Sequence, residues 1–283
     1  MGRRRGGGRR RGSFKVRLLI GVVLALFALG QHFLSRSTNP VTGETDYTSI
    51  QAHEDLRFGL QAMDELAYQF GGPSSDLAAQ QRVEQIGARL VDAIQVVYGD
   101  TLQDLPYEFS FTLLEDDQVV NAFALPGGPT FITEALYRAL GTEDAIAGVM
   151  GHEIGHVLHR HGAERIAKQE LMSGLAGATV MASGDYTTGQ VASMVGNFLQ
   201  MKYGREDELE SDKTGLRLMD AAGYDPAAMV RVMQVLNEAS GGARGGTPEW
   251  ASTHPHPESR IEQIQQILQE MGHTGHAHAG HRH

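Results

Sequence analysis

Cysteine is missing from all 283 residues of the sequence. Disulfide bonds and thiolate metal ligands are therefore excluded, so a zinc site would have to use histidine and carboxylate side chains. An oxidising compartment is compatible with this absence but is not required by it. Hydrophobic residues make up 41% of the chain, which is enough to build the core of one large domain or two small ones.

Long hydrophobic runs are also scarce. The longest uninterrupted run, from Leu18 to Gly30, is short and suits the apolar part of a signal peptide. Apolar residues continue to Leu34, however, and we slightly favour a membrane span from about Val16 to Leu34 over cleavage near Gly30. Segment 1–34 is thus predicted to be a basic stretch followed by a membrane anchor or signal.

Acidic residues are absent from segment 1–17, which carries eight Arg or Lys. Its formal charge is +8, so the total of −10 leaves −18 for the remaining chain. A basic stretch before an apolar run is typical of a membrane signal whose basic end stays in the cytoplasm. The acidic body would then lie across the membrane. Because that body repels phosphate, we predict no nucleic-acid partner.

The spacing of apolar residues predicts a mainly α fold with a small antiparallel β-sheet, that is, an α+β domain. Residues 35–49 are predicted to form a linker, and residues 50–271 a single domain. Within that domain a helical scaffold covers 50–99 and a core covers 106–271. Residues 272–283 form a histidine-rich tail that cannot build a core, so we expect it to be disordered and to bind metal loosely.

The core is predicted to contain both strands and helices. Side chains alternate in polarity over residues 106–114, which indicates a half-buried strand, and further strands are expected over 119–125 and 130–133. Helical periodicity predicts a helix from Thr142 through the next motif, and later helices over 166–181, 191–201, 206–222, 226–239 and 257–271.

The chain is organised around an H-E-x-x-H motif at His152-Glu153-Ile154-Gly155-His156. Residues four apart on an α-helix lie about 40° apart around the axis and about 6 Å apart along it. His152 and His156 can therefore both reach one tetrahedral zinc ion. Glu153 is one step round the helix, where it can accept a proton from the attacking water as a general base.

A catalytic zinc ion of this kind needs a third protein ligand and one open position. No H-x-x-G-x-x-H continuation follows the motif, and cysteine is unavailable, so a carboxylate on a later helix is predicted. The densest acidic helical stretch begins after Gly204. Composition alone leaves Glu206, Glu208 and Glu210 as alternatives, because charge runs usually form solvated surface.

Three motifs together resemble the gluzincin metallopeptidases, a family that includes the CAAX prenyl proteases, HtpX and the periplasmic BepA-like and Oma-like proteases. They are the H-E-x-x-H motif, Arg205-x-x-Glu208-x-x-x-Asp212, and the strand and turn from Asn121 to Gly128. The resemblance covers about Tyr107 to Met271. The single N-terminal apolar segment is more similar to the periplasmic or Oma-type branch than to the multi-spanning branches.

The resemblance implies roles for individual residues. It implies one Zn²⁺ per chain and Glu153 as the general base, with the ligands His152, His156 and Glu208. Asp212 would orient a zinc histidine through a hydrogen bond. Arg205 would orient Glu208 or help to hold the transition-state oxyanion. Ser211 departs from the family, which usually has Ala at this position.

Two further elements are similar to parts of the family that surround the active site. The strand Asn121, Ala122, Phe123 and Ala124 implies a sheet edge to which an extended peptide can add, with simple core packing as the alternative for Phe123 and Leu125. His254, in a Thr-His-Pro element, is predicted to be a lid histidine near the zinc ion or the oxyanion, with a capping turn as the equal alternative. His159 is expected to pack or to support a ligand, since three ligands are already supplied.

The resemblance implies a zinc metalloendopeptidase that hydrolyses unfolded or misfolded proteins in quality control of the cell envelope. The expected location is the bacterial inner membrane, single-pass with the catalytic domain in the periplasm, or the periplasm itself if residues 1–30 are removed. The alternative function is a zinc-bound envelope chaperone or assembly factor with a latent or gated protease site. The sequence predicts neither the oligomeric state nor the specific substrate.

Overall fold

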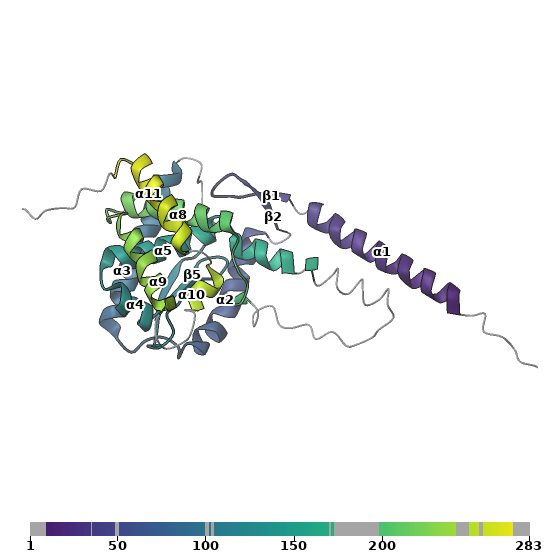
Figure 1. Ribbon diagram of the computed structural model, residues 1–283, viewed down its shortest axis with the longest axis horizontal. Helices are drawn as coiled ribbons and strands as arrows, with labels where there is room; N and C mark the ends of the chain where they lie inside the picture. The colour runs from purple at the N-terminus through teal and green to yellow at the C-terminus, as the bar shows by residue number, and fades with distance from the viewer. Residues whose placement is uncertain are drawn as a thin grey trace, which may run out of the picture.

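Helices form most of the chain, and the computed structural model in Figure 1 shows them packed around a small sheet. The structure describes residues 10–34, 36–48, 51–99, 102, 105–169, 171–172, 198–241, 249–254 and 257–273. The predicted class, mainly α with a small sheet, is confirmed. Most of the helices predicted over 166–181 and 191–201, and the tail from residue 274, lie outside the described residues.

The N-terminal helix α1, Arg10–Leu34, extends away from the rest of the chain (Figure 1). Its apolar run is exposed, with Leu19, Leu26 and Phe27 each 62–63% accessible. Among the described residues, no helix combines the length and the apolar character that crossing a membrane requires.

The segment predicted as a linker contains a short hairpin. β1, Arg36–Thr38, pairs antiparallel with β2, Thr45–Tyr47. Asn39 closes the turn, because its side-chain oxygen accepts hydrogen bonds from the backbone N–H groups of residues 41 and 42. Its amide group also donates to the carbonyl of Leu158 at 2.9 Å. One side chain thus ties the hairpin to the end of the motif helix, a long-range contact that local composition could not predict.

Two long helices form the helical scaffold that the sequence predicts over 50–99, α2 over Ala52–Gln69 and α3 over Leu77–Tyr98. Asp76 caps α3, since its carboxylate accepts hydrogen bonds from the backbone N–H groups of residues 78 and 79. Each helix buries one apolar stripe, represented by Leu66 in α2 and Leu90 in α3. These stripes pack into the two hydrophobic clusters that form the core.

The central sheet has three strands: β3, Ser110–Leu114; β4, Ala122–Ala124; and β5, Pro129–Thr133. Their order is β3-β5-β4, with β3 parallel to β5 and β4 antiparallel to β5. The sheet is therefore mixed, and not purely antiparallel as predicted, because the chain places β4 on the far side of β5 from β3. This order makes β4 an edge strand.

Helix α4, Glu134–Leu140, was not predicted and leads from β5 to the motif helix α5, Glu143–Leu158. Thr142 caps α5 as expected, because its hydroxyl accepts a hydrogen bond from the N–H of residue 145. α5 is buried from residue 145 to residue 158. The motif therefore lies in the interior of the domain and not on its surface.

Helix α8, Arg205–Ala221, packs against α5 at very short range. A Cβ atom added to Gly155 would lie 2.9 Å from the Cα of Ser211, and one added to Gly215 would lie 2.9 Å from the backbone nitrogen of His152. Neither position has room for a side chain. The small residues on both helices let the two backbones touch, which brings the acidic face of α8 to the motif histidines.

The C-terminal part adds α9, Ala228–Gly241, α10, Glu249–Thr253, and α11, Pro257–Glu270. The sequence predicts α9 and α11 but not α10, which is barely longer than one turn. α10 nevertheless buries Trp250, and α11 buries the guanidinium of Arg260. Both side chains contribute to the candidate active site.

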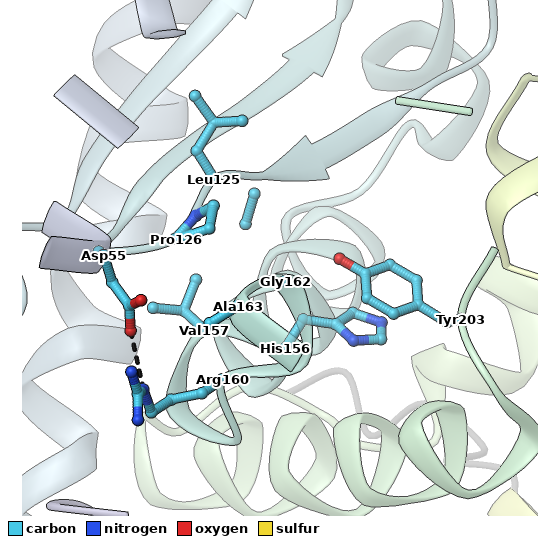
Figure 2. A pocket seen from close by; sticks show the side chains of 11 residues that line it. Asp55, Leu125, Pro126, His156, Val157, Arg160, Gly162, Ala163 and Tyr203 are labelled. Carbon is cyan, nitrogen blue, oxygen red and sulfur yellow. Dashed lines mark hydrogen bonds and ion pairs between the residues drawn. The ribbon is translucent and has the colours of Figure 1, made fainter. Parts of the chain in front are cut away.

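A buried charge cluster joins the hairpin, α2 and the residues after α5. Arg160, which has a φ of 58°, donates hydrogen bonds to Asp55 Oδ2 at 2.8 Å and to Asp46 Oδ2 at 3.0 Å. Figure 2 shows the contact with Asp55. Two carboxylates share this guanidinium, and Asp55 Oδ1 has no hydrogen-bond partner. Burial outweighs the attraction of Arg160 and raises the pKa of Asp55 to about 6.

The raised pKa of Asp55 predicts a pH-dependent stability. The folded chain keeps a proton on Asp55 that the unfolded chain releases near the ordinary pKa of 3.8. This stabilisation is fully present below about pH 4 and is lost as the pH rises through about 6. Asp55→Asn does not titrate there, so from about pH 4 to about pH 7 its free energy of unfolding should rise by about 1–3 kcal/mol relative to wild type. Urea denaturation at both pH values measures this, and an unchanged difference would contradict the assignment.

Candidate active site

The two motif histidines converge on one point from the same face of α5. His152 Nε2 and His156 Nε2 lie 3.1 Å apart, and the residues are 1% and 2% exposed. Burial, with the neighbouring His152, holds the pKa of His156 well below its usual range. His156 is therefore neutral, as a metal-binding imidazole must be.

Helix α8 brings Glu208 to the same point. Its Oε2 lies 3.5 Å from His152 Nε2, and its Oε1 lies 3.6 Å from His156 Nε2. Donors that share a tetrahedral zinc ion at 2.0–2.2 Å are about 3.3 Å apart. The two imidazoles and the carboxylate therefore fit zinc in both spacing and chemistry. The other two acids that composition left open lie elsewhere, because Glu206 is exposed and Glu210 contacts His161.

Asp212, one helical turn after Glu208, contacts the His152 ring at Nδ1, the nitrogen that does not face the ion position. His152 Nδ1 donates to Asp212 Oδ1 at 2.9 Å, which leaves the Nε2 lone pair to face the ion position. Burial alone would raise the pKa of Asp212, but the charge of Arg260 and the hydrogen bond from His152 outweigh it and set this pKa to about 2. Asp212 is therefore an ionised acceptor, in the place that the resemblance implies for it.

Arg260, on α11, is a site residue that the sequence analysis missed. Its guanidinium donates to Asp212 Oδ2 at 2.8 Å and to Glu208 Oε2 at 2.5 Å. Burial opposes ionisation of Glu208, but the charges of His254 and Arg260 outweigh it and hold the pKa of Glu208 below its usual value. Arg205, which the resemblance implies either orients Glu208 or helps to hold the oxyanion, begins α8 with an exposed side chain, and no contact in the described part of the chain joins it to Glu208.

A signal for Arg260 was present in the sequence. Arg260, Ile264 and Leu268 are spaced four residues apart and share one buried face of α11. A charged residue at an apolar helical position is almost never fully buried unless it is paired. That position predicts a partner inside the domain, although it does not identify the partner.

Glu153 is fully buried, and Trp250 contacts it. Trp250 Nε1 donates to Glu153 Oε1 at 3.4 Å, whereas Glu153 Oε2 has no protein partner among the described residues. One carboxylate oxygen is thus held in place while the other can accept a proton. Trp250 was not predicted as a site residue, although it is the only tryptophan of the sequence and lies four residues before His254.

His254 lies beside the ion position. Its Nδ1 is 2.9 Å from Glu208 Oε1 and 3.3 Å from His152 Nε2, and its Nε2 is 3.6 Å from Glu153 Oε1. Donor atoms of His152, His156, Glu208 and His254 lie within 4.8 Å of one another, a spacing that can hold one metal ion. The Trp250 ring stacks on the His254 ring at 4.5 Å between centroids. The side chains of α10 and its following residue therefore cover the site.

An aromatic ring closes the other side of the site. Figure 2 shows Tyr203 beside His156, and the two rings stack with centroids 3.7 Å apart and planes 17° from parallel. The guanidinium carbon of Arg165 lies over the Tyr203 ring, 3.6 Å from its centroid. The cavity drawn in Figure 2, between His156 and the turn at Pro126, has a volume of only ≈ 10 Å³. A cavity of this size has room for about one water molecule and not for a substrate side chain.

The four residues predicted to bind substrate, Asn121 to Ala124, are all buried. Among the strands that the structure describes, β4 pairs with β5 alone, so it forms a sheet edge as expected. The N–H of Trp250 donates to the carbonyl of Val120 at 3.4 Å, just before β4. Helix α10 therefore lies beside the edge to which a peptide would add.

A family model described as "Peptidase family M48" matches residues 77–268, which is more than half of the chain. The chain belongs to peptidase family M48. The resemblance to the family of Oma-like and BepA-like metallopeptidases is thereby confirmed. The matched span runs from the start of α3 to near the end of α11, and it therefore includes every residue of the candidate active site.

Named relatives of this M48 chain are similar along most of its length. The mitochondrial metalloendopeptidase OMA1 of Schizosaccharomyces pombe is 29% identical over 82% of this chain and 66% of its own. The beta-barrel assembly-enhancing protease of Escherichia coli is 27% identical over 89% of this chain and 52% of its own. OMA1 of Saccharomyces cerevisiae is 34% identical over 52% of this chain and 43% of its own. The chain thus spans about half to two thirds of the length of the first two relatives.

Proposed function

We propose that this M48 chain is a zinc-dependent metalloendopeptidase. The single observation that carries the proposal is the convergence of His152, His156 and Glu208 on one point, with the buried, unpartnered Glu153 Oε2 on the neighbouring residue of the motif. Two imidazoles and one carboxylate, with a general base beside them, form the donor set of a hydrolytic zinc site.

The chain's own residues have distinct tasks in peptide hydrolysis. When bound, zinc polarises the scissile carbonyl and makes the attacking water more acidic. Glu153 accepts the proton from that water through Oε2 and passes it to the leaving amine. Trp250 holds Glu153 Oε1 during this exchange, and Asp212 keeps the His152 ring in its ligating orientation. Arg260 maintains both α8 carboxylates in the ionised form.

Metal removal tests this function directly. Chelation should abolish cleavage of a labelled, chemically unfolded protein, and Zn²⁺ should restore it. Mg²⁺ should not, because it prefers oxygen donors and octahedral geometry. Cleavage rate and metal content are measured on the same sample. Full activity of the metal-free chain would refute a zinc peptidase.

The substrates that we propose are unfolded or misfolded proteins. β4 offers an edge strand next to the ion position, and main-chain pairing with such an edge accepts many sequences. A folded substrate could not present an extended segment there. The name of the E. coli relative, a beta-barrel assembly-enhancing protease, supports a role in quality control of envelope proteins.

The described arrangement corresponds to a closed site. His254 contacts Glu208, Trp250 contacts both Glu153 and the carbonyl of Val120 just before β4, and all the site carboxylates are buried. We infer that α10 moves aside for substrate. The second candidate function, an envelope chaperone with a latent protease site, rests on this same closure.

Replacing His254 with Ala should open the site. A hydrogen bond to a charged group contributes about 1.5–3 kcal/mol, so losing the contact with Glu208 shifts the closed–open balance by about tenfold or more. We therefore expect His254→Ala to raise the rate of peptide cleavage. His273→Ala, which changes a partly exposed histidine paired with Asp220, serves as the control. A fall in activity with zinc still bound would show instead that His254 supports the transition state.

We also propose that α1 attaches the chain to a membrane and that the acidic body lies on the periplasmic side. The exposed apolar residues of α1 and the basic segment before them support this location. Removal of residues 1–34 should release the protein from the membrane fraction of bacterial cells. Equal recovery of both forms in the soluble fraction would contradict membrane attachment.

A further inference from the structure

A second group of possible metal ligands lies just beyond the end of α5. His159, His161 and Glu210 each offer one donor atom, and these atoms lie within 4.8 Å of one another. Glu210 Oε2 is 3.1 Å from His161 Nε2 and 3.7 Å from His159 Nδ1. The first of these distances already matches the spacing of about 3.3 Å between ligands of a tetrahedral ion. None of the three residues belongs to the zinc site at His152, His156 and Glu208.

His159 has a buried donor atom without a hydrogen-bond partner. Its side chain is only 10% exposed, and its Nε2 is 2.9 Å from the hydroxyl of Thr214. Its Nδ1 points toward two carboxylates, with Glu44 Oε2 at 3.3 Å and Glu210 Oε2 at 3.7 Å. Nevertheless, Nδ1 makes no well-formed hydrogen bond to either carboxylate.

The charges around His159 favour a cation. Two carboxylates, from the β1–β2 hairpin and from α8, face the imidazole edges. Burial lowers the pKa of His159, so this ring is a neutral imidazole. With its proton on Nε2, where Thr214 can accept it, Nδ1 offers a lone pair to an ion. In that tautomer the nitrogen and the two carboxylate oxygens repel one another unless a positive charge lies between them. A dication would balance the two formal negative charges.

We propose that His159 Nδ1, His161 Nε2 and Glu210 form a second site for a divalent transition-metal ion, with Glu44 of the hairpin as a fourth ligand. Two imidazoles with carboxylates select zinc and related ions over Mg²⁺ or Ca²⁺. The His159 and His161 rings lie 13° from parallel with centroids 5.4 Å apart. An imidazole lone pair lies in the plane of its ring, so two nearly parallel rings cannot both direct a lone pair at one ion. The His159 ring therefore turns when the ion binds, and the half-exposed Glu210 side chain adjusts to it.

The proposed second site is coupled to the first through one hydrogen bond. His161 Nδ1 lies 2.9 Å from His156 Nδ1 and 3.3 Å from the hydroxyl of Ser211. When His161 binds an ion through Nε2, its remaining proton is on Nδ1, where Ser211 can accept it. His156 Nδ1–H then loses His161 as its acceptor. Occupancy of either site must therefore change the affinity of the other by the same factor.

Metal counting on the full-length chain tests the second site. The wild type is dialysed against buffered free Zn²⁺, and bound zinc is measured by mass spectrometry beside His159→Gln and Glu210→Gln. Both variants should bind one ion fewer per chain than the wild type. The histidine-rich tail is identical in all three proteins, so any zinc that it binds cancels in the difference. Equal zinc content in the wild type and both variants would overturn the proposal.

Two further variants keep the result interpretable. Glu208→Gln should remove the other ion, so failure of the first site and failure of the second are seen separately. Glu44→Gln lies on the hairpin and should weaken the second ion by about tenfold without abolishing it, as loss of one ligand or its support usually does. Thermal denaturation in chelator checks that each variant is folded. Co²⁺ in place of Zn²⁺ should show tetrahedral absorption bands from two sites in the wild type and from one in His159→Gln.

Discussion

Glu153→Gln should greatly slow peptide cleavage while leaving the zinc content equal to that of the wild type. The amide keeps the size of the side chain, and its oxygen can still accept the hydrogen bond from Trp250. It cannot take a proton from water. Positioned general acid–base groups contribute about 10²- to 10⁴-fold to rate, so we expect a loss of that size. The turnover number on an unfolded protein and the metal content are measured together.

The matched control for this variant is Glu206→Gln, on the exposed face of α8. It makes the same chemical change away from the site and should keep wild-type turnover. If Glu153→Gln retained full activity with zinc bound, the assignment of the general base would be wrong. If it lost zinc as well as activity, Glu153 would be supporting the metal site and not transferring the proton.

Arg260→Met should produce the largest loss of stability of the variants considered. The guanidinium neutralises two buried carboxylates, Asp212 and Glu208, and methionine retains only its apolar stem. Removing one partner of a buried ion pair costs about 3–5 kcal/mol. Zinc affinity should also fall by about 10–100-fold, because the groups that orient and charge the ligands are disturbed. Urea denaturation in chelator gives the first quantity, and competition with a calibrated zinc chelator gives the second.

Two variants make the Arg260 result specific. Arg260→Lys retains the charge but not the two-pronged contact, so it should lose less stability while still binding zinc more weakly. Arg205→Met changes the exposed arginine of the family motif and should leave both quantities at their wild-type values if Arg260 has the orienting role. A loss of zinc affinity in Arg205→Met alone would restore the role that sequence analysis gave to Arg205.

Local spacing was sufficient to predict the centre of the site. His152, Glu153 and His156 depend only on the geometry of one helix, and the resemblance added Glu208 and Asp212 on a second helix. Arg260 and Trp250 could not be found in this way. They reach the site from elements far along the chain, α11 and α10, whose positions follow from tertiary packing and not from periodicity.

The fold shows the same division between local and long-range features. Caps and apolar stripes predicted α2, α3, α5 and α8 to within a few residues. Strand order was not predicted, because β3 pairs with β5, beyond β4 in the sequence. The hairpin was missed because its anchors, Asn39 and Asp46, bind partners more than 100 residues away.

The contact between α5 and α8 has a consequence for how metal affinity is encoded. Three of the proposed ligands and the acceptor behind His152 lie on these two helices, and the spacing of the helices is set by Gly155, Gly215 and Ser211. One methyl group at either glycine would push the two backbones apart and separate His152 and His156 from Glu208. The affinity of the zinc site therefore depends partly on two glycines that contact no metal, and a search restricted to the ligands would overlook them.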